Sequence, residues 1–93
     1  QIHEYNDSLV SIEKLEVQDL KLFPNPTTGI VFTDINANSQ LRVYSMDGKL
    51  VMEEYVPESI NNVDLSQLSN GMYLIRIDSE EGVFLGRVAV FKE

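Results

Sequence analysis

The sequence predicts an all-β fold, an immunoglobulin-like antiparallel β-sandwich of about seven strands. From Leu20 onward, short apolar or alternating runs recur about every ten residues, and Gly, Asn, Asp and Pro separate them. Such spacing is typical of the strands and turns of a sandwich. The expected strands cover residues 20–23, 29–33, 40–46, 49–56, 60–65, 72–78 and 83–91. A chain of 93 residues accommodates one small domain of this kind.

The stretch FPNPTTG, Phe23 to Gly29, should form a rigid corner between the first two strands. Each proline fixes its own φ and keeps the preceding residue, Phe23 or Asn25, extended. Gly29 can then supply a turn conformation that other residues adopt only at a cost. The corner contains no nucleophile, metal ligand or phosphate-binding loop, so these residues alone predict an architectural role.

Asp47 and Gly48 are predicted to form a two-residue type I′ turn, because both residue types tolerate positive φ. The opposed pairs of this hairpin are then Met46–Lys49, Ser45–Leu50, Tyr44–Val51, Val43–Met52 and Arg42–Glu53. Its core face should contain Leu41, Val43, Leu50 and Met52. The Arg42–Glu53 pair lies on the other face, where opposite charges stabilise a sheet slightly.

The last two strands should form a second hairpin through residues 79–82, with Asp78 opposite Val83. Its core face contains Tyr73, Ile75, Ile77, Phe84 and Val88. The opposite face presents a basic, partly apolar surface on an acidic molecule, made of Leu74, Arg76, Leu85 and Arg87. This surface is a candidate contact site, although two arginines on a solvated face need no function.

The stretch LSQLSNGMY, Leu65 to Tyr73, should close one end of the sandwich with Leu65 and Leu68. Asn70 and Gly71 then turn the chain into the next strand. The Tyr73 hydroxyl can bond back to upstream backbone, as in the tyrosine corner of immunoglobulin-like sandwiches. A core tyrosine after a turn is the simpler alternative, and it predicts the same fold.

The composition excludes several classes of function. The formal net charge of −8 repels phosphate backbones and anionic lipid, so neither nucleic acid nor membrane insertion is expected. The chain has no cysteine, and its one histidine, His3, is close to the terminus. Cysteine-based zinc sites and Cys/His catalysis are therefore excluded, and no cofactor is predicted.

Residues 1–19 differ from the remainder of the chain in their charge and in their pattern of apolar residues. They carry a net charge of −4, as much as the other 74 residues together. The apolar Ile12, Leu15 and Val17 fit neither a helix nor a strand pattern, which favours a flexible acidic linker. A strand added to the sheet edge around Leu15 to Val17 is the alternative. Since Gln1 is not an initiator residue, we expect a longer chain upstream.

No residue pattern predicts catalysis or a metal site. DINANS at 34–39 begins like a calcium loop, but Ser39 and Ser45 stand where the loop needs glycine and a bidentate glutamate. The neighbouring glutamates at 53–54 and 80–81 point to opposite faces of their strands, so neither pair forms an acid/base couple. Exposed aromatic side chains leave a carbohydrate-binding or adhesion module of a secreted protein as an alternative function.

Four sequence elements follow one another along the chain: FPNPTTG at 23–29, VYSMDGKLV at 43–51, VDLSQLSNGMYLIRI at 63–77 and GRVAVFKE at 86–93. In this order they resemble the type A C-terminal sorting domain of the type IX secretion system, and the resemblance covers residues 20–93. The matching positions are Pro24, Asn25 and Pro26 with Gly29, then Asp47, Gly48 and Lys49, then Gly71 and Tyr73, and finally Arg87 in the terminal segment GRVAVFKE. Family members often carry several lysines in that segment, whereas this chain has only Arg87 and Lys92.

The resemblance implies a non-catalytic transport signal of a Gram-negative bacterium. The upstream passenger domain would cross the inner membrane by a signal peptide, fold in the periplasm, and pass the outer-membrane translocon with the help of shuttle proteins. A sortase-like cysteine peptidase would then cut within residues 1–19, leaving the passenger anchored at the cell surface or secreted. The candidate translocon contacts are Arg76, Leu85, Arg87 and Lys92.

Overall fold

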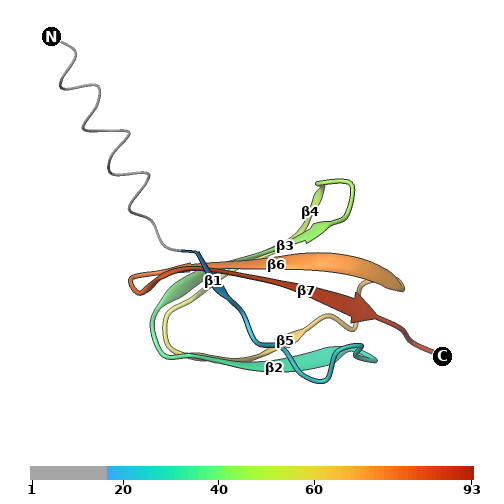
Figure 1. The fold of residues 1–93 in the computed structure, drawn as a ribbon, viewed down its shortest axis with the longest axis horizontal. Helices are drawn as coiled ribbons and strands as arrows, with labels where there is room; N and C mark the ends of the chain where they lie inside the picture. The colour runs from blue at the N-terminus through green and yellow to red at the C-terminus, as the bar shows by residue number, and fades with distance from the viewer. Residues whose placement is uncertain (1–16) are drawn as a thin grey trace, which may run out of the picture.

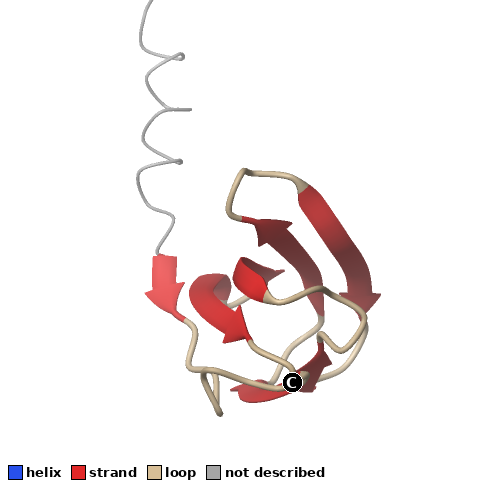
Figure 2. Ribbon diagram, turned by 90° about the vertical axis from the view of Figure 1, so that its right-hand side faces the viewer, coloured by secondary structure: helices blue, strands red, loops and turns tan. Residues whose placement is uncertain are grey.

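Residues 17–93 are described by a computed structural model, in which two β-sheets pack face to face (Figure 1). The strands are β1 (Val17–Asp19), β2 (Ile30–Ile35), β3 (Ser39–Ser45), β4 (Leu50–Val56), β5 (Ile60–Asp64), β6 (Gly71–Ser79) and β7 (Gly82–Val90). One sheet has the order β1-β7-β6-β3-β4, and the other pairs β2 with β5. Strands and loops make up this whole region (Figure 2), which confirms the all-β sandwich.

The core lies between the two sheets and follows the period-two alternation of the strands. In β6, Tyr73, Ile75 and Ile77 are buried, whereas the residues between them face outward and are half-buried. Val31 of β2 meets them from the second sheet. Leu65, which follows β5, is fully buried, as its predicted place at the end of the sandwich requires. Full burial of such a side chain contributes about 1.5–3 kcal/mol.

The β6–β7 hairpin has the predicted register. Asp78 lies opposite Val83, and Arg76 lies opposite Leu85. The five residues predicted for its core face are all buried: Tyr73, Ile75, Ile77, Phe84 and Val88. This prediction is confirmed because the turn at residues 79–82 sets a register that places these five side chains on one face.

The tip of the β3–β4 hairpin differs from the predicted turn. Gly48 is the residue with positive φ, 89°, and its N–H donates to the Ser45 carbonyl at 2.9 Å. The Ser45 N–H donates to the Lys49 carbonyl at 2.9 Å, so the loop contains the three residues from Met46 to Gly48. The predicted type I′ turn is therefore wrong, because a three-residue loop ending in a left-handed glycine also accommodates Asp-Gly.

The longer loop shifts the register near the tip. Arg42 lies opposite Glu53 as predicted, and its Nε donates to Glu53 Oε2 at 3.0 Å. Tyr44, however, pairs with Leu50, which leaves Val51 as the extra residue of a bulge. The predicted pairs that the bulge makes wrong are Tyr44–Val51, Ser45–Leu50 and Met46–Lys49.

The bulge also changes which residue of β4 reaches the core. Leu41 and Val43 are buried as predicted, and Met52 packs against the core. Leu50, also predicted to be core, is 44% exposed. Val51 packs against the core in its place, because an extra residue reverses the alternation of a strand.

The first strand does not lie at residues 20–23, where a strand was predicted. β1 occupies Val17–Asp19 instead and pairs with β7 in parallel, the one parallel pair among the described strands. A strand added to the sheet edge was the alternative for this part of the chain, and Val17 belongs to it. Residues 1–16 lie outside the described residues, so the linker and its cleavage region stay a prediction.

The tyrosine corner is confirmed. The Tyr73 hydroxyl donates to the Ser69 carbonyl at 2.7 Å, across the turn that leads from β5 to β6. The ring itself is buried in the core. One residue therefore ties the loop to the sheet and fills the interior.

Candidate functional site

Residues 17–27, which we call the strap, run along the outer edge of β7. β1 pairs with Val83–Leu85, and the Leu20 N–H donates to the Leu85 carbonyl at 2.8 Å. Farther on, the Thr27 N–H donates to the Ala89 carbonyl at 2.8 Å, and Thr27 accepts from the Phe91 N–H at 2.8 Å. The strap thus accompanies the C-terminal strand from one end to the other.

The FPNPTTG corner, residues 23–29, begins in the second half of the strap and continues past its end. Its Phe23–Pro24 and Asn25–Pro26 peptide bonds are cis. Asn25 Nδ2 donates to the Arg87 carbonyl at 2.9 Å, and Asn25 Oδ1 accepts from the Ala89 N–H at 3.0 Å. The corner therefore contacts the C-terminal strand directly.

Gly29 does not have the role that the sequence predicted. Its φ is not positive, so the prediction of a turn conformation costly for other residues is wrong. A Cβ at this position would lie 3.3 Å from the Ser66 Cβ, and the Gly29 N–H donates to Thr27 Oγ1 at 3.1 Å. Gly29 is needed for close packing against the loop after β5.

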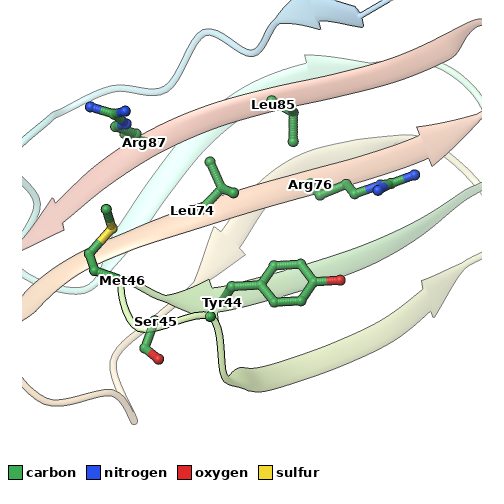
Figure 3. Close-up of a pocket in the computed structure, with 8 residues that line it drawn as sticks. Tyr44, Ser45, Met46, Leu74, Arg76, Leu85 and Arg87 are labelled. Atoms are coloured by element: carbon green, nitrogen blue, oxygen red, sulfur yellow. The ribbon is translucent and has the colours of Figure 1, made fainter. Parts of the chain in front are cut away.

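The outer face of β6 and β7 holds an open groove of about 420 Å³, which we call the basic groove (Figure 3). It is lined by Tyr44, Ser45, Met46, Gly48, Leu74, Arg76, Leu85 and Arg87. The two guanidinium groups lie at opposite ends of the groove, with Leu74 and Leu85 between them. The structure thus brings together three of the four predicted contact residues.

The two arginines of the groove differ in their electrostatics. Asp78 accepts from Arg76 at 3.0 Å, and this hydrogen bond with its opposite charge raises the pKa of Arg76. Asp78 also bonds Arg42 at 3.3 Å. Within residues 17–93, Arg87 has no ion pair, and its side chain is exposed. Arg87 is therefore the cation of the groove that is open to an external anion.

Neither a metal centre nor a membrane-spanning helix is evident in residues 17–93. No group of three or more His, Cys, Asp or Glu side chains there can hold a metal ion. Within the same range, no helix is long and apolar enough to cross a membrane.

Comparison with known protein families shows to which family the chain belongs. A family profile described as "Secretion system C-terminal sorting domain" matches residues 21–90. The chain belongs to this family of type IX sorting domains. No curated protein matches the chain. A sorting domain of this kind is non-catalytic, interacts with the secretion machinery, and directs its protein to the cell surface or out of the cell.

The Asp47-Gly48-Lys49 element of the sorting domain forms one end of the basic groove. The Ser45 hydroxyl bonds the Asp47 carboxylate, and this hydrogen bond is the main cause that lowers the pKa of Asp47. Ser45 and Gly48 both line the groove, next to Met46. The tip of the β3–β4 hairpin and the arginine face therefore belong to one surface.

Lys92, the fourth predicted contact of the sorting domain, does not line the groove. Its N–H donates to Asn70 Oδ1 at 2.8 Å, and its carbonyl accepts from Asn70 Nδ2 at 3.1 Å. Its ammonium group donates to the Ser66 carbonyl at 2.9 Å. In the structure Lys92 holds the C-terminal tail against the loop that precedes β6.

Sequence reasoning missed several residues of this face. Tyr44 and Met46 line the groove beside the arginines. A second open hollow, of about 540 Å³, continues past Arg87 and is lined in part by Lys21 and Asp19 of the strap. The alternation of β3 gives a signal for Tyr44. Lys21 has no such signal, because it lies outside any strand, where the strap follows the edge of β7.

Proposed function

We propose that this domain carries an upstream passenger through the type IX outer-membrane translocon, and that the basic groove contacts the translocon or a shuttle protein. The observation that carries the proposal is Arg87, an exposed cation without an ion pair, beside Leu74 and Leu85 on a molecule of net charge −8. A partner with carboxylates flanked by apolar side chains complements such a surface in charge and in hydrophobicity.

The remaining steps of transport are part of the same proposal. The passenger reaches the periplasm by a signal peptide, and a sortase-like cysteine peptidase removes the domain by cutting within residues 1–19. The position of that segment supports this order of events. Residues 1–16 precede β1 in the sequence, so a cut among them leaves all seven strands of the sandwich intact.

A reporter fusion tests the proposal. Residues 1–93 are joined to the C-terminus of a fluorescent protein that carries a signal peptide, and the fusion is expressed in a bacterium with a functional type IX system and in its translocon mutant. We expect surface or extracellular fluorescence in the first strain only. Binding to a glycan array without export would instead favour the carbohydrate-binding or adhesion module.

Two variants of the fusion locate the recognition surface. Removal of Val83–Glu93 should trap the fusion in the periplasm, but it also removes Phe84 and Val88 from the core. Arg87→Glu is the sharper variant, because it reverses an exposed charge and leaves the core unchanged. We expect it to reduce export several-fold with an unchanged circular dichroism spectrum. Export at the wild-type level would contradict the placement of the contact in the groove.

A further inference from the structure

The strap reaches β7 by backbone hydrogen bonds at Leu20 and Thr27, and between them by the side chain of Asn25. Proline has no N–H, so Pro24 and Pro26 cannot donate to a neighbouring strand. The Asn25 side-chain amide carries one acceptor and a donor, as a peptide group does. It donates to the Arg87 carbonyl at 2.9 Å and accepts from the Ala89 N–H at 3.0 Å.

This side chain closes the outer edge of the C-terminal strand. The Leu85 carbonyl is bonded by Leu20, the Arg87 carbonyl by Asn25, and the Ala89 carbonyl by Thr27. An edge strand whose outward groups are paired cannot accept an added strand from another chain. A partner therefore has to approach β7 through its face, where the Arg87 side chain lies.

On its inner side the backbone at Arg87 is paired with β6, where Arg87 lies opposite Leu74. Its neighbour Gly86 has no side chain that could anchor the strand, and the Arg87 guanidinium has no ion pair within residues 17–93. Glycine is also the residue with the greatest backbone freedom. The hydrogen bond from Asn25 to the Arg87 carbonyl therefore holds this part of the strand on its outer side, opposite to β6.

We propose that Asn25 is a positioning residue that closes the outer edge of β7 and fixes the backbone from which Arg87 enters the basic groove. This inference rests on the proposed function of that groove. It assigns the PNP corner an active part in recognition, exerted through Arg87, although Asn25 itself lies at the sheet edge and not in the groove lining.

The first test is amide hydrogen exchange of the isolated domain, measured by NMR for wild type and Asn25→Ala. Loss of one hydrogen bond should make the Ala89 amide exchange about five- to tenfold faster. The Phe91 amide, which is bonded to the Thr27 carbonyl, should change much less. Unchanged exchange at Ala89 would overturn the closure of the edge by Asn25.

The second test is a double-mutant cycle in the reporter fusion, with Asn25→Ala, Arg87→Ala and both together. A residue that acts through Arg87 should reduce export several-fold in the wild-type background and have no further effect once Arg87 is alanine. If Asn25→Ala lowers export by the same factor in both backgrounds, its role is general stability and the proposal is overturned.

Asp64→Ala is the matched control, because it also removes a side chain-to-backbone hydrogen bond, from the Ser66 N–H at 2.9 Å in the other sheet. It should export normally even where its melting temperature falls as far as that of Asn25→Ala. An equal loss of export would overturn the proposal. If the wild-type fusion is not exported, the proposed function fails together with the role of Asn25 in recognition, and the exchange measurement still decides the closure of the edge.

Discussion

Gly86 is the position where the strap crosses closest to the C-terminal strand, and Gly86→Ala probes that crossing. A Cβ at residue 86 would lie 2.8 Å from the Leu20 carbonyl oxygen and 2.9 Å from Leu22 Cδ1. The first of these atoms is backbone, and the Leu20 N–H is bonded to the Leu85 carbonyl at 2.8 Å. The strap therefore cannot move away without weakening its attachment to β7.

The expected cost follows from this geometry. Overpacking by one methyl group against a held backbone destabilises by about 1–3 kcal/mol. For a domain of this size, each kcal/mol lowers the melting temperature by about 4–8 °C. Urea denaturation of the isolated domain measures the loss, and hydrogen exchange at the Leu20 amide shows whether it arises at the strap.

Gly48→Ala provides the comparison. A Cβ there meets no atom within 4 Å, so its cost comes only from the φ of 89° at the loop tip. It should leave exchange at the Leu20 amide unchanged. The reasoning is refuted if Gly86→Ala unfolds at the wild-type urea concentration with the Leu20 amide as protected as before.

Two further predictions concern stability. Tyr73→Phe removes the hydrogen bond to the Ser69 carbonyl and should cost about 0.5–1.5 kcal/mol in urea denaturation, with the fold unchanged by circular dichroism; an unaltered midpoint would contradict it. Hydrogen bonds from Ser66 lower the pKa of Asp64, so their stabilisation is present at neutral pH and is lost as the pH falls through the folded-state pKa. The melting temperature of Asp64→Asn should therefore fall less with decreasing pH than that of the wild type. An equal fall in both proteins would refute this.

The strands of the sandwich were predictable wherever alternation and turn chemistry agree. In β6 and β7 the residues of one face are consistently apolar and the turn is short, so one register buries that face. The face that carries Arg76 and Arg87 follows from the same alternation. The pairing of Arg42 with Glu53 was also predicted correctly, because these two residues lie on the side of the bulge away from the hairpin tip.

The hairpin tip was not predictable from its residues. Asp-Gly satisfies a two-residue turn and a three-residue loop equally well, and the two differ by one position in register. The choice of the longer loop turned Leu50 outward and brought Val51 to the core. Packing against the second sheet, which no local pattern contains, decides between them.

The strap escaped prediction for a different reason. LKLF at 20–23 alternates like a strand, yet only Phe23 forms a bridge, to Phe32 of β2. At Asn25 the pairing with β7 is made by a side chain, which leaves no trace in hydrophobic periodicity. The contact of Lys92 with the Ser66 carbonyl was likewise invisible, since it joins positions 26 residues apart through a side chain.

The parallel pairing of β1 with β7 also determines how the domain responds to mechanical force. The chain enters the pair at Val17 beside Val83, and the C-terminus leaves from the opposite end of the sheet (Figure 1). If the proposed passenger pulls on the N-terminal end while the translocon holds the C-terminal tail, the tension slides the two strands past each other. Their hydrogen bonds then share the force and do not open one after another. The pairing of β1 with β7 should therefore resist a pull applied between the two ends of the domain.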